Sequence, residues 1–164
     1  MKDCTDAYLD IETTGLSPRF HEITVAGIYL VCGGSGRLVQ LVSRDITRDS
    51  LLEALEGVHT IHTYNGSRFD LPFIQCRLDI DLAGIFPHRD LMYDCWKRNL
   101  YGGYKAVECR LGIPRELKDV SGYEAVLLWN RYRRYGDGNA LAKLLHYNRE
   151  DVMNLKLLRE MMDL

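Results

Sequence analysis

The sequence of 164 residues has no long apolar run and little net charge. Its longest apolar stretch, residues 25–32, is far shorter than the roughly 20 residues that a membrane-spanning helix needs. The N-terminus has no apolar segment typical of a signal peptide. With 46% hydrophobic residues and a net charge of −2, the composition argues against a disordered chain. We therefore expect one domain spanning residues 1–164, cytoplasmic and without a membrane partner.

Cysteine is scarce and scattered. The five cysteines stand at positions 4, 32, 76, 95 and 109, and no two of them form a C-x-x-C pair. This spacing argues against a zinc or iron–sulfur site built from cysteines and against a disulfide framework. Free thiols fit a reducing cytosol, and we interpret each cysteine as a small buried hydrophobe. The sequence also lacks internal repeats, low-complexity segments and linkers.

The two charge signs are distributed unevenly along the chain. Residues 1–88 carry 7 basic and 12 acidic side chains, whereas residues 89–149 carry 12 basic and 7 acidic ones. An acidic half could hold a cation and a basic middle a polyanion, although a plain solvated surface is compatible with the same pattern. Because the whole chain is not strongly basic, we do not expect tight, sequence-independent binding to long duplexes.

Periodicity predicts an α/β fold, with strands first and helices later. The expected strands are residues 7–12, 23–31, 37–43 and 58–64. The expected helices are residues 50–55, 68–78, 90–99, 105–111, 122–135 and 139–162, the first capped by Thr47 or Asp49 and the last by Asp137. The first three strands are joined so tightly that they should form an antiparallel meander, to which parallel strands are added. The fold class is therefore a mixed sheet flanked by helices.

Two acidic residues occur where a buried strand is expected. Asp10 and Glu12 lie two apart in the apolar segment of residues 7–12, so their side chains point to the same face of the strand. Two carboxylates on one buried face repel each other and resist desolvation. This placement indicates a cation between them.

Two further acids stand at positions where functional and structural interpretations compete. Asp70 lies at the junction of a strand and a helix, where sites accumulate, but an acid there also stabilises a helix N-terminus. Asp151 is four residues after Tyr147 in the last helix, so the two share a face. Taken alone, this pair is best explained as exposed neighbours, and Arg149 and Glu150 as a solvated surface.

Together these segments resemble the DEDD (DnaQ-like) superfamily of 3′→5′ exonucleases, which has a ribonuclease H-like fold. The first motif of that family is a strand carrying D-x-E followed by T-x-G-L, matched by Asp10, Glu12 and residues 13–16. The second motif, N-x-x-x-F-D, is matched by Asn65, Phe69 and Asp70.

The third motif of the tyrosine-type (DEDDy) branch is Y-x-x-x-D, and Tyr147 and Asp151 match it. The residues around these motifs are most similar to those of the YprB-like branch. The resemblance spans residues 9–151, nearly the whole chain. A histidine-type site would need a His four or five residues before Asp151; His146 meets that spacing, but the residues around Tyr147 favour the tyrosine type.

The resemblance implies catalysis by two divalent ions, Mg²⁺ or Mn²⁺, held by Asp10, Glu12, Asp70 and Asp151. Oxygen ligands without His or Cys suit these metals. Two ions about 4 Å apart stabilise the attacking and leaving oxygens of a displacement at phosphorus. Tyr147 would orient the attacking water, whose activation comes mainly from the metal because a free tyrosine has a pKa of about 10.

Weaker inferences concern the binding of substrate. The resemblance implies contacts from Glu12 and the backbone of residues 13–15 to the 3′-hydroxyl, and a wedge against the last base from Leu16. For Thr14 and Gly15, a turn that closes the first strand is an equal interpretation. The remaining candidates for substrate contact are Thr13, Asn65 and Phe69, although an Asn before Gly more often forms a turn.

Two other features have competing interpretations. Asp90 is best explained as a helix N-cap. Residues 131–135 alternate arginine and tyrosine and could bind a phosphate backbone and stack on bases, although the end of a solvated helix has the same composition.

The sequence therefore predicts a metal-dependent 3′→5′ exonuclease acting on the 3′ end of single-stranded DNA or RNA. A substrate of very short oligonucleotides or structured RNA stays open. The alternatives are a non-catalytic nucleic-acid-binding or scaffolding module on the same fold and an unrelated α/β domain. The nature of the sugar, the oligomeric state and any partner protein lie beyond the sequence.

Overall fold

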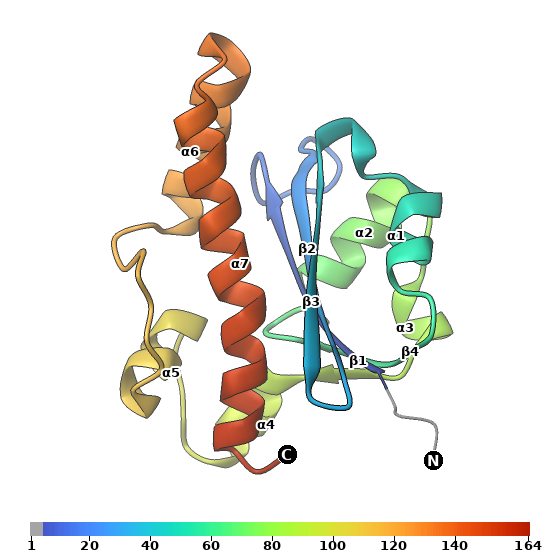
Figure 1. Ribbon diagram of the computed structural model, residues 1–164, viewed down its shortest axis with the longest axis vertical. Coiled ribbons are helices and arrows are strands. Elements are labelled where there is room, and N and C mark those ends of the chain that lie inside the picture. The colour runs from blue at the N-terminus through green and yellow to red at the C-terminus, as the bar shows by residue number, and fades with distance from the viewer. Residues whose placement is uncertain (1–4) are drawn as a thin grey trace.

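The computed structural model describes residues 5–164, which form a five-stranded mixed sheet with helices on both faces (Figure 1). The order across the sheet is β3-β2-β1-β4-β5. β1 pairs with β2 and β2 with β3 in antiparallel fashion, whereas β1–β4 and β4–β5 are parallel. The strands are β1 (Thr5–Thr13), β2 (Ile23–Cys32), β3 (Ser35–Val42), β4 (Val58–Thr63) and β5 (His88–Asp90).

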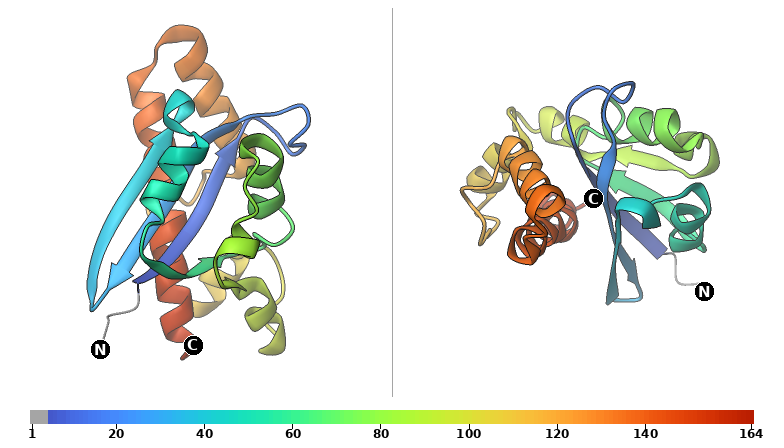
Figure 2. Two further views of the ribbon diagram at one scale, coloured as in Figure 1. Left: turned by 90° about the vertical axis from the view of Figure 1, so that its right-hand side faces the viewer. Right: turned by 90° about the horizontal axis from the view of Figure 1, so that it is seen from above.

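The helices divide between the two faces of the sheet (Figures 1 and 2). One face is covered by α1 (Arg48–Ala54), α2 (Asp70–Leu78) and α3 (Leu82–Ile85). The other carries α4 (Leu91–Lys97), α5 (Tyr104–Leu111), α6 (Gly122–Tyr135) and α7 (Gly138–Met161). A short 3₁₀ helix, η1 (Ser43–Asp45), follows β3. Of the described helices, none combines the length and apolar character needed to cross a membrane.

The expected α/β class, the meander and the added parallel strands are confirmed. Each expected strand and helix is present, with ends shifted by at most two residues. Three short elements were missed, η1, α3 and β5, because stretches of three or four residues are too short to show a periodicity.

The interpretation of the cysteines as buried hydrophobes holds only in part. Cys95 is fully buried, but Cys76 and Cys109 are exposed, so the interpretation is wrong for these two. Cys32 is half-buried, and Cys4 lies outside the described residues. Both exposed cysteines lie on outer faces of helices, where spacing of apolar residues does not require burial.

Alternation along β1 separates its apolar and acidic side chains. Ala7, Leu9 and Ile11 are buried in the apolar core that also contains side chains of α1 and α2. The intervening residues face the opposite side, where Tyr8 packs with α4, α5 and α7. Asp10 and Glu12 follow Tyr8 at spacings of two and four, so the period of the strand directs both carboxylates toward α7.

Hydrogen-bonding side chains fix the starts of the helices that carry these faces. Thr47, not Asp49, caps α1, and its hydroxyl accepts from the backbone of Ser50. Asp90 caps α4 and Asp137 caps α7, as expected from the sequence. The helix that Asp137 caps, α7, carries both Tyr147 and Asp151.

Candidate metal centre and active-site cleft

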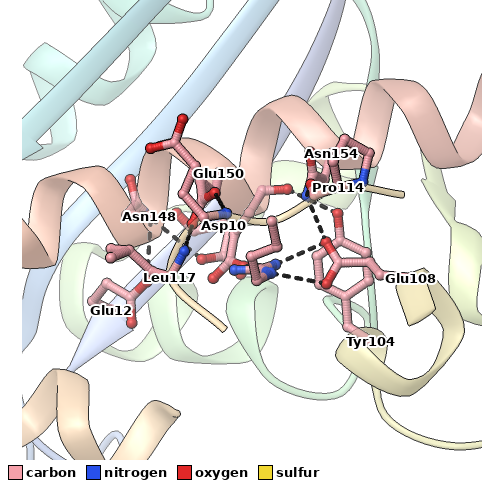
Figure 3. Close-up of polar contacts among 12 residues, drawn as sticks. Asp10, Glu12, Tyr104, Glu108, Pro114, Leu117, Asn148, Glu150 and Asn154 are labelled. Carbon is pink, nitrogen blue, oxygen red and sulfur yellow. Dashed lines mark hydrogen bonds and ion pairs between the residues drawn. The ribbon is translucent and has the colours of Figure 1, made fainter. Parts of the chain in front are cut away.

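Three carboxylates from two elements converge on one point of the sheet. Oxygens of Asp10, Glu12 and Asp151 all lie within 4.8 Å of one another, the first two from β1 and the third from α7. Glu12 is 7% exposed, Asp151 is 5% exposed, and Asp10 is half-buried. Figure 3 shows Asp10 and Glu12 side by side beneath the helix. The structure therefore brings together three of the four acids expected to bind metal.

The fourth acid, Asp70, lines the same cleft. It is the first residue of α2, is 3% exposed, and accepts a hydrogen bond at 3.0 Å from the backbone N–H of Ile11 in β1. The cleft has a volume of about 310 Å³. Asp70 is thus both a helix N-terminal acid and a wall of the site, so the two interpretations of this residue are compatible. We call this cavity the active-site cleft; its lining includes Asp10, Glu12, Thr13, Gly15, Leu16, Tyr64, Asn65, Phe69, Asp70, Gly122, Val126, Tyr147 and Asp151.

Burial without enough neighbouring positive charge raises the pKa of all four acids. Burial, with repulsion from Asp151 and other site carboxylates, raises the pKa of Asp10 and of Glu12 well above the usual range. Burial raises the pKa of Asp70 to about 7, and that of Asp151 to about 6 despite the opposing effect of Arg115. A bound cation would relieve this repulsion. The donors are carboxylate oxygens, which fit Mg²⁺ or Mn²⁺.

A buried amide connects the strand acids to the helix. Asn148 is fully buried in α7, and its Nδ2 donates to the backbone carbonyl of Asp10 at 3.3 Å and to its Oδ2 at 3.2 Å. Its Oδ1 accepts from Nε2 of Gln40 at 3.0 Å. Gly27 leaves the necessary room, because a Cβ there would lie 2.0 Å from Oδ1 of Asn148. Sequence reasoning assigned no role to these three residues, since only the register of β1 with β2 places Gly27 opposite Asp10.

A buried arginine, also missed from the sequence, binds the third acid. Arg115 lies in the loop between α5 and α6 and is 8% exposed. It pairs with Asp151 and donates two hydrogen bonds, at 3.0 and 2.8 Å, to the carboxylate of Glu108. Nδ2 of Asn154 also donates to Glu108 at 2.8 Å, and Figure 3 shows Glu108, Asn154 and Tyr104 adjoining the site.

This network gives Asp151 a fixed orientation. Its backbone carbonyl accepts from the hydroxyl of Tyr104 at 2.9 Å, and its carboxylate pairs with Arg115. Nη1 of Arg115 is buried and has no hydrogen-bond partner within residues 5–164. An arginine in a loop carries no sequence signal for such burial, because its pairing with both Glu108 and Asp151 arises only from folding.

Tyr147 and His146 occupy different environments. Tyr147 is 7% exposed and lines the active-site cleft, where burial and then Asp151 raise its pKa well above the usual range. His146 lies outside that lining and pairs with Glu116 at 3.0 Å. Nζ of Lys105 lies 4.8 Å from the centroid of the Tyr147 ring, and Lys105 lines a hollow next to the cleft that shares Asp10, Tyr147 and Asp151 with it. Lys105 is a further residue that sequence reasoning missed.

Two interpretations of α7 are corrected by its packing. The pair Tyr147 and Asp151, taken alone, was expected to be exposed, but both side chains are buried. Tyr147 belongs to an apolar cluster with Val25 of β2 and with α6, and Asp151 pairs with Arg115 of the loop before α6. Glu150 was expected to be solvated, yet it accepts hydrogen bonds from the backbone N–H groups of Glu116 and Leu117. It therefore holds the loop that presents Arg115. The physical reason is that α7 is covered on two sides, which its own periodicity does not reveal.

The loop carrying the second motif is held by a single carboxylate. Asp90 accepts from the backbone N–H groups of Asn65 and Ser67 at 2.8 and 3.0 Å, in addition to capping α4. Asn65 has φ of +60°, the left-handed conformation, and its carbonyl accepts from Phe69. Asn65 thus forms a turn, the commoner role for an Asn before Gly, while it and Phe69 also line the cleft.

The segment after β1 forms a turn beside the cleft. The hydroxyl of Thr13 donates to the carbonyl of Gly15 at 2.7 Å, and that of Thr14 accepts from the backbone of Glu22. A Cβ on Gly15 would lie 2.4 Å from the His21 ring, so a larger residue there would have to displace that ring. Leu16 is 85% exposed at the edge of the cleft. The turn interpretation holds for Thr14 and Gly15, and Thr13, Gly15 and Leu16 also border the cleft.

Comparisons with known proteins agree with this architecture. The family model of the RNase H superfamily matches residues 7–163. The structure is similar to a family B DNA polymerase from the hyperthermophilic archaeon Pyrobaculum calidifontis, with a TM-score of 0.74 and 14% identity over 96% of this chain. It is also similar to a structure described as the apo form of a nuclease, with a TM-score of 0.60 and 18% identity over 98% of this chain.

This chain spans 24% of the polymerase and 72% of the nuclease. At these identities the similarities concern the fold alone. No curated protein matches the chain. The family match confirms the ribonuclease H-like fold that the sequence motifs led us to expect.

Proposed function

This chain belongs to the RNase H superfamily, and on that premise we propose that it is a metal-dependent nuclease. The observation that carries the proposal is the convergence of Asp10, Glu12 and Asp151 within 4.8 Å, with Asp70 in the same cleft. A structural cluster of acids would be neutralised by neighbouring cations. Here Arg115 pairs with Asp151, and no Lys, Arg or His within residues 5–164 forms an ion pair with Asp10, Glu12 or Asp70.

The four acids would hold the two divalent ions. When bound, such ions polarise the phosphate and lower the pKa of an attached water. The protein itself would position the acids: Asn148 supports Asp10, the Ile11 backbone supports Asp70, and Arg115 supports Asp151. Support of this kind typically changes metal affinity or activity by about 10–100-fold.

Tyr147 and Lys105 would act on the substrate side of the cleft. The raised pKa keeps the Tyr147 phenol protonated at neutral pH, so we assign it a hydrogen-bonding role toward water or phosphate rather than that of a base. Lys105, beside the Tyr147 ring, would contribute positive charge toward a phosphate oxygen. Thr13, Gly15, Leu16, Asn65 and Phe69 would contact the terminal nucleotide, since they border the cleft.

We further propose that the enzyme is a tyrosine-type (DEDDy) 3′→5′ exonuclease of the YprB-like branch, acting on single-stranded DNA or RNA. Water would attack the phosphorus, the bond to the 3′ oxygen of the preceding nucleotide would break, and a 5′-mononucleotide would leave. The motif match and the location of Tyr147 in the cleft, with His146 outside it, support this assignment. The match over residues 7–163 supports one catalytic domain, and the location in the cytoplasm stays a prediction from composition.

The test uses 5′-labelled single-stranded DNA and RNA oligonucleotides with Mn²⁺ and, in parallel, EDTA. We expect a ladder that shortens from the 3′ end, requires metal, and disappears with Asp10→Ala. Asp6→Asn serves as the matched control, because Asp6 lies on the same strand but outside the cleft.

Metal binding is measured separately by the melting temperature. A ligand at 100 times its Kd stabilises the native state by about 2.7 kcal/mol, so Mn²⁺ should raise the melting temperature of the wild type and not of Asp10→Ala. Metal binding without cleavage of either strand would favour a restricted substrate. Neither binding nor cleavage would favour the non-catalytic scaffold and would refute the proposed function.

A further inference from the structure

A second cavity, rich in arginine, lies beyond the active-site cleft. It has a volume of about 380 Å³ and is bordered by the start of β2, η1, the end of α2 and the C-terminal half of α6. Three arginines, Arg44, Arg77 and Arg133, line it above a floor that includes Ile23 and Trp129. We call this cavity the arginine groove.

The three guanidinium groups lack strong carboxylate partners. Arg77 lies 3.9 Å from Glu22, whose side chain is 75% exposed, and this is the one ion pair that the three arginines form within residues 5–164. Cζ of Arg133 lies 5.9 Å from the centroid of the Trp129 ring, and Arg44 has no side-chain hydrogen bond to any described residue. Three cations and one carboxylate, Glu22, line the groove, so its net charge is positive and favours an anion. The planar arginine fork matches phosphate oxygens.

The same helix faces line both cavities. On α6, Gly122 and Val126 border the active-site cleft, and Trp129 and Arg133 border the arginine groove. These spacings of four, three and four residues form one continuous stripe along the helix. From Gly122 to Arg133 the stripe is about 16 Å long, at 1.5 Å per residue.

Helix α2 and the loop between β1 and β2 also line both cavities. Asp70 at the start of α2 lines the cleft, and Arg77, two turns later on the same face, lines the groove. In the loop between β1 and β2, Leu16 borders the cleft and Glu22 the groove. Three separate elements, α6, α2 and the loop between β1 and β2, therefore each line both the active-site cleft and the arginine groove.

We propose that the arginine groove binds the sugar–phosphate backbone of a single strand whose 3′ end lies in the active-site cleft. This rests on the proposed nuclease function and extends it to the substrate. At about 3.4 Å per stacked nucleotide, the distance of about 16 Å corresponds to roughly five nucleotides. Trp129 is 6% exposed, so it supports Arg133 and offers no face for a base. Recognition is therefore of phosphates, independent of base sequence.

The groove also refines the arginine–tyrosine segment of residues 131–135. Only Arg133 of that segment lines the groove. Arg131 is paired with Asp137 at 2.7 Å, and Tyr135 is 74% exposed outside the groove. Phosphate binding by this segment thus depends on one of its arginines joined to Arg44 and Arg77 from elsewhere in the chain.

The test compares a triple variant, Arg44→Gln with Arg77→Gln and Arg133→Gln, with the wild type. Binding of a fluorescent 20-nucleotide single strand is measured by anisotropy in EDTA at several salt concentrations, where no cleavage occurs. We expect Kd to rise at least tenfold, and the slope of log K against log salt to fall by about 2, at about 0.7 per phosphate contact. The single variant Arg133→Gln should show a smaller change of the same sign.

A matched triple variant controls for net charge. Arg37→Gln, Arg110→Gln and Lys143→Gln remove the same charge from exposed positions outside the groove and the cleft. This control should bind the 20-mer as the wild type does. Equal weakening by both triple variants would overturn the proposal, as would a groove variant with unchanged Kd and slope, or a wild type that does not bind the 20-mer at low salt.

Cleavage separates this proposal from the function on which it rests. With Mn²⁺, the groove variant should show a raised KM for the 20-mer and an unchanged rate on a dinucleotide, which is too short to reach the groove. Loss of both rates would place the arginines in the catalytic centre and overturn the groove. A wild type that cleaves neither substrate would refute the nuclease function, whereas the anisotropy result would still decide whether the groove binds the strand.

Discussion

The two ends of β1 carry acidic side chains in opposite electrostatic environments. At its N-terminal end, Asp6 pairs with His62 at 3.1 Å and with Arg159, which also donates to the hydroxyl of Tyr8. Burial favours the neutral acid there, but the hydrogen bonds from Arg159 and His62 prevail and lower the pKa of Asp6. At the other end, the pKa of Asp10 is raised.

The difference lies in how the neighbours balance the charge. Asp6 has two cationic or titratable partners for one carboxylate, so its cluster is complete within the protein. Asp10 and Glu12 have an amide, Asn148, which donates hydrogen bonds but carries no charge. One strand therefore holds a structural ion pair and, a few residues later, a site that lacks a cation. Incomplete neutralisation distinguishes a ligand site from a structural cluster.

The largest expected loss of stability is at Arg115, the buried arginine that pairs with Asp151. Arg115→Gln leaves Glu108 and Asp151 buried without a cation, so it should lower the free energy of unfolding by about 3–5 kcal/mol. The measurement is urea unfolding in EDTA at pH 7. Arg115→Lys should recover only part of the loss, because a lysine cannot replace the bidentate contact with Glu108. A loss below 1 kcal/mol would contradict the role assigned to this network.

Neutralising an acid at each end of β1 should have opposite effects on stability. Asp10→Asn should raise the free energy of unfolding in EDTA, because it removes repulsion, and should lower the cleavage rate more than about 100-fold, since even a supporting residue of a metal site costs 10–100-fold. Asp6→Asn should lower stability and leave the rate unchanged. Cleavage rates and urea unfolding are measured on the same preparations. Stability changes of the same sign in both variants would remove the distinction between the two ends.

The pH dependence of stability should show both environments at once. In EDTA, Asp70 and Asp151 have folded-state pKa values of about 7 and about 6, above the unfolded value, so the folded protein binds more protons between pH 4 and 7. Their contribution to the free energy of unfolding therefore decreases as pH rises through this window, by at most about 1.4 kcal/mol per pH unit for each excess proton.

Asp6 acts in the opposite direction. Its lowered pKa contributes stability above its unfolded pKa, and that contribution is lost as pH falls through the folded value. Urea unfolding is measured from pH 4 to 8. Between pH 4 and 7 the free energy of unfolding of Asp70→Asn should fall less steeply with rising pH than that of the wild type, whereas Asp6→Asn should keep the slope of the wild type. An Asp70→Asn profile parallel to that of the wild type would show that Asp70 is not buried in its acidic form.

The smallest effect on stability is expected at the N-terminal end of β1, where Arg159 pairs with Asp6. Arg159 and Asp6 are each about a quarter exposed, so Arg159→Gln should cost about 1 kcal/mol or less, and less still at high salt. Urea unfolding at 0.05 and 1 M NaCl measures this. Equal costs for Arg159→Gln and Arg115→Gln would show that burial does not separate the two arginines.

Much of the fold was predictable because strand and helix periods are local. The alternation of residues 7–12 placed Asp10 and Glu12 on one face, and the i, i+4 spacing placed Tyr147 beside Asp151. The structure brings these residues into one cleft. The burial of Tyr147 and Asp151 was not predictable from α7 alone, because it depends on contacts with the sheet, with α6 and with the loop before α6.

The residues that were missed depend on contacts between distant segments. Asn148 reaches Asp10 across 138 positions in the chain, and Arg115 reaches Asp151 across 36. Neither amide nor guanidinium has a local pattern that indicates its partner. The arginine groove likewise combines residues from three separate elements, of which the sequence indicated only the one that contains Arg133.

The sequence by itself determined which carboxylates face the same side of β1 and which helix face carries Tyr147 and Asp151, since both follow from backbone periods of two and 3.6 residues. Tertiary structure decided which charges are balanced. It paired Arg159 and His62 with Asp6 and Arg115 with Asp151, and among residues 5–164 it gave Asp10 no ion pair, because the distance between charges is set by how the sheet, α7 and the loop before α6 pack together.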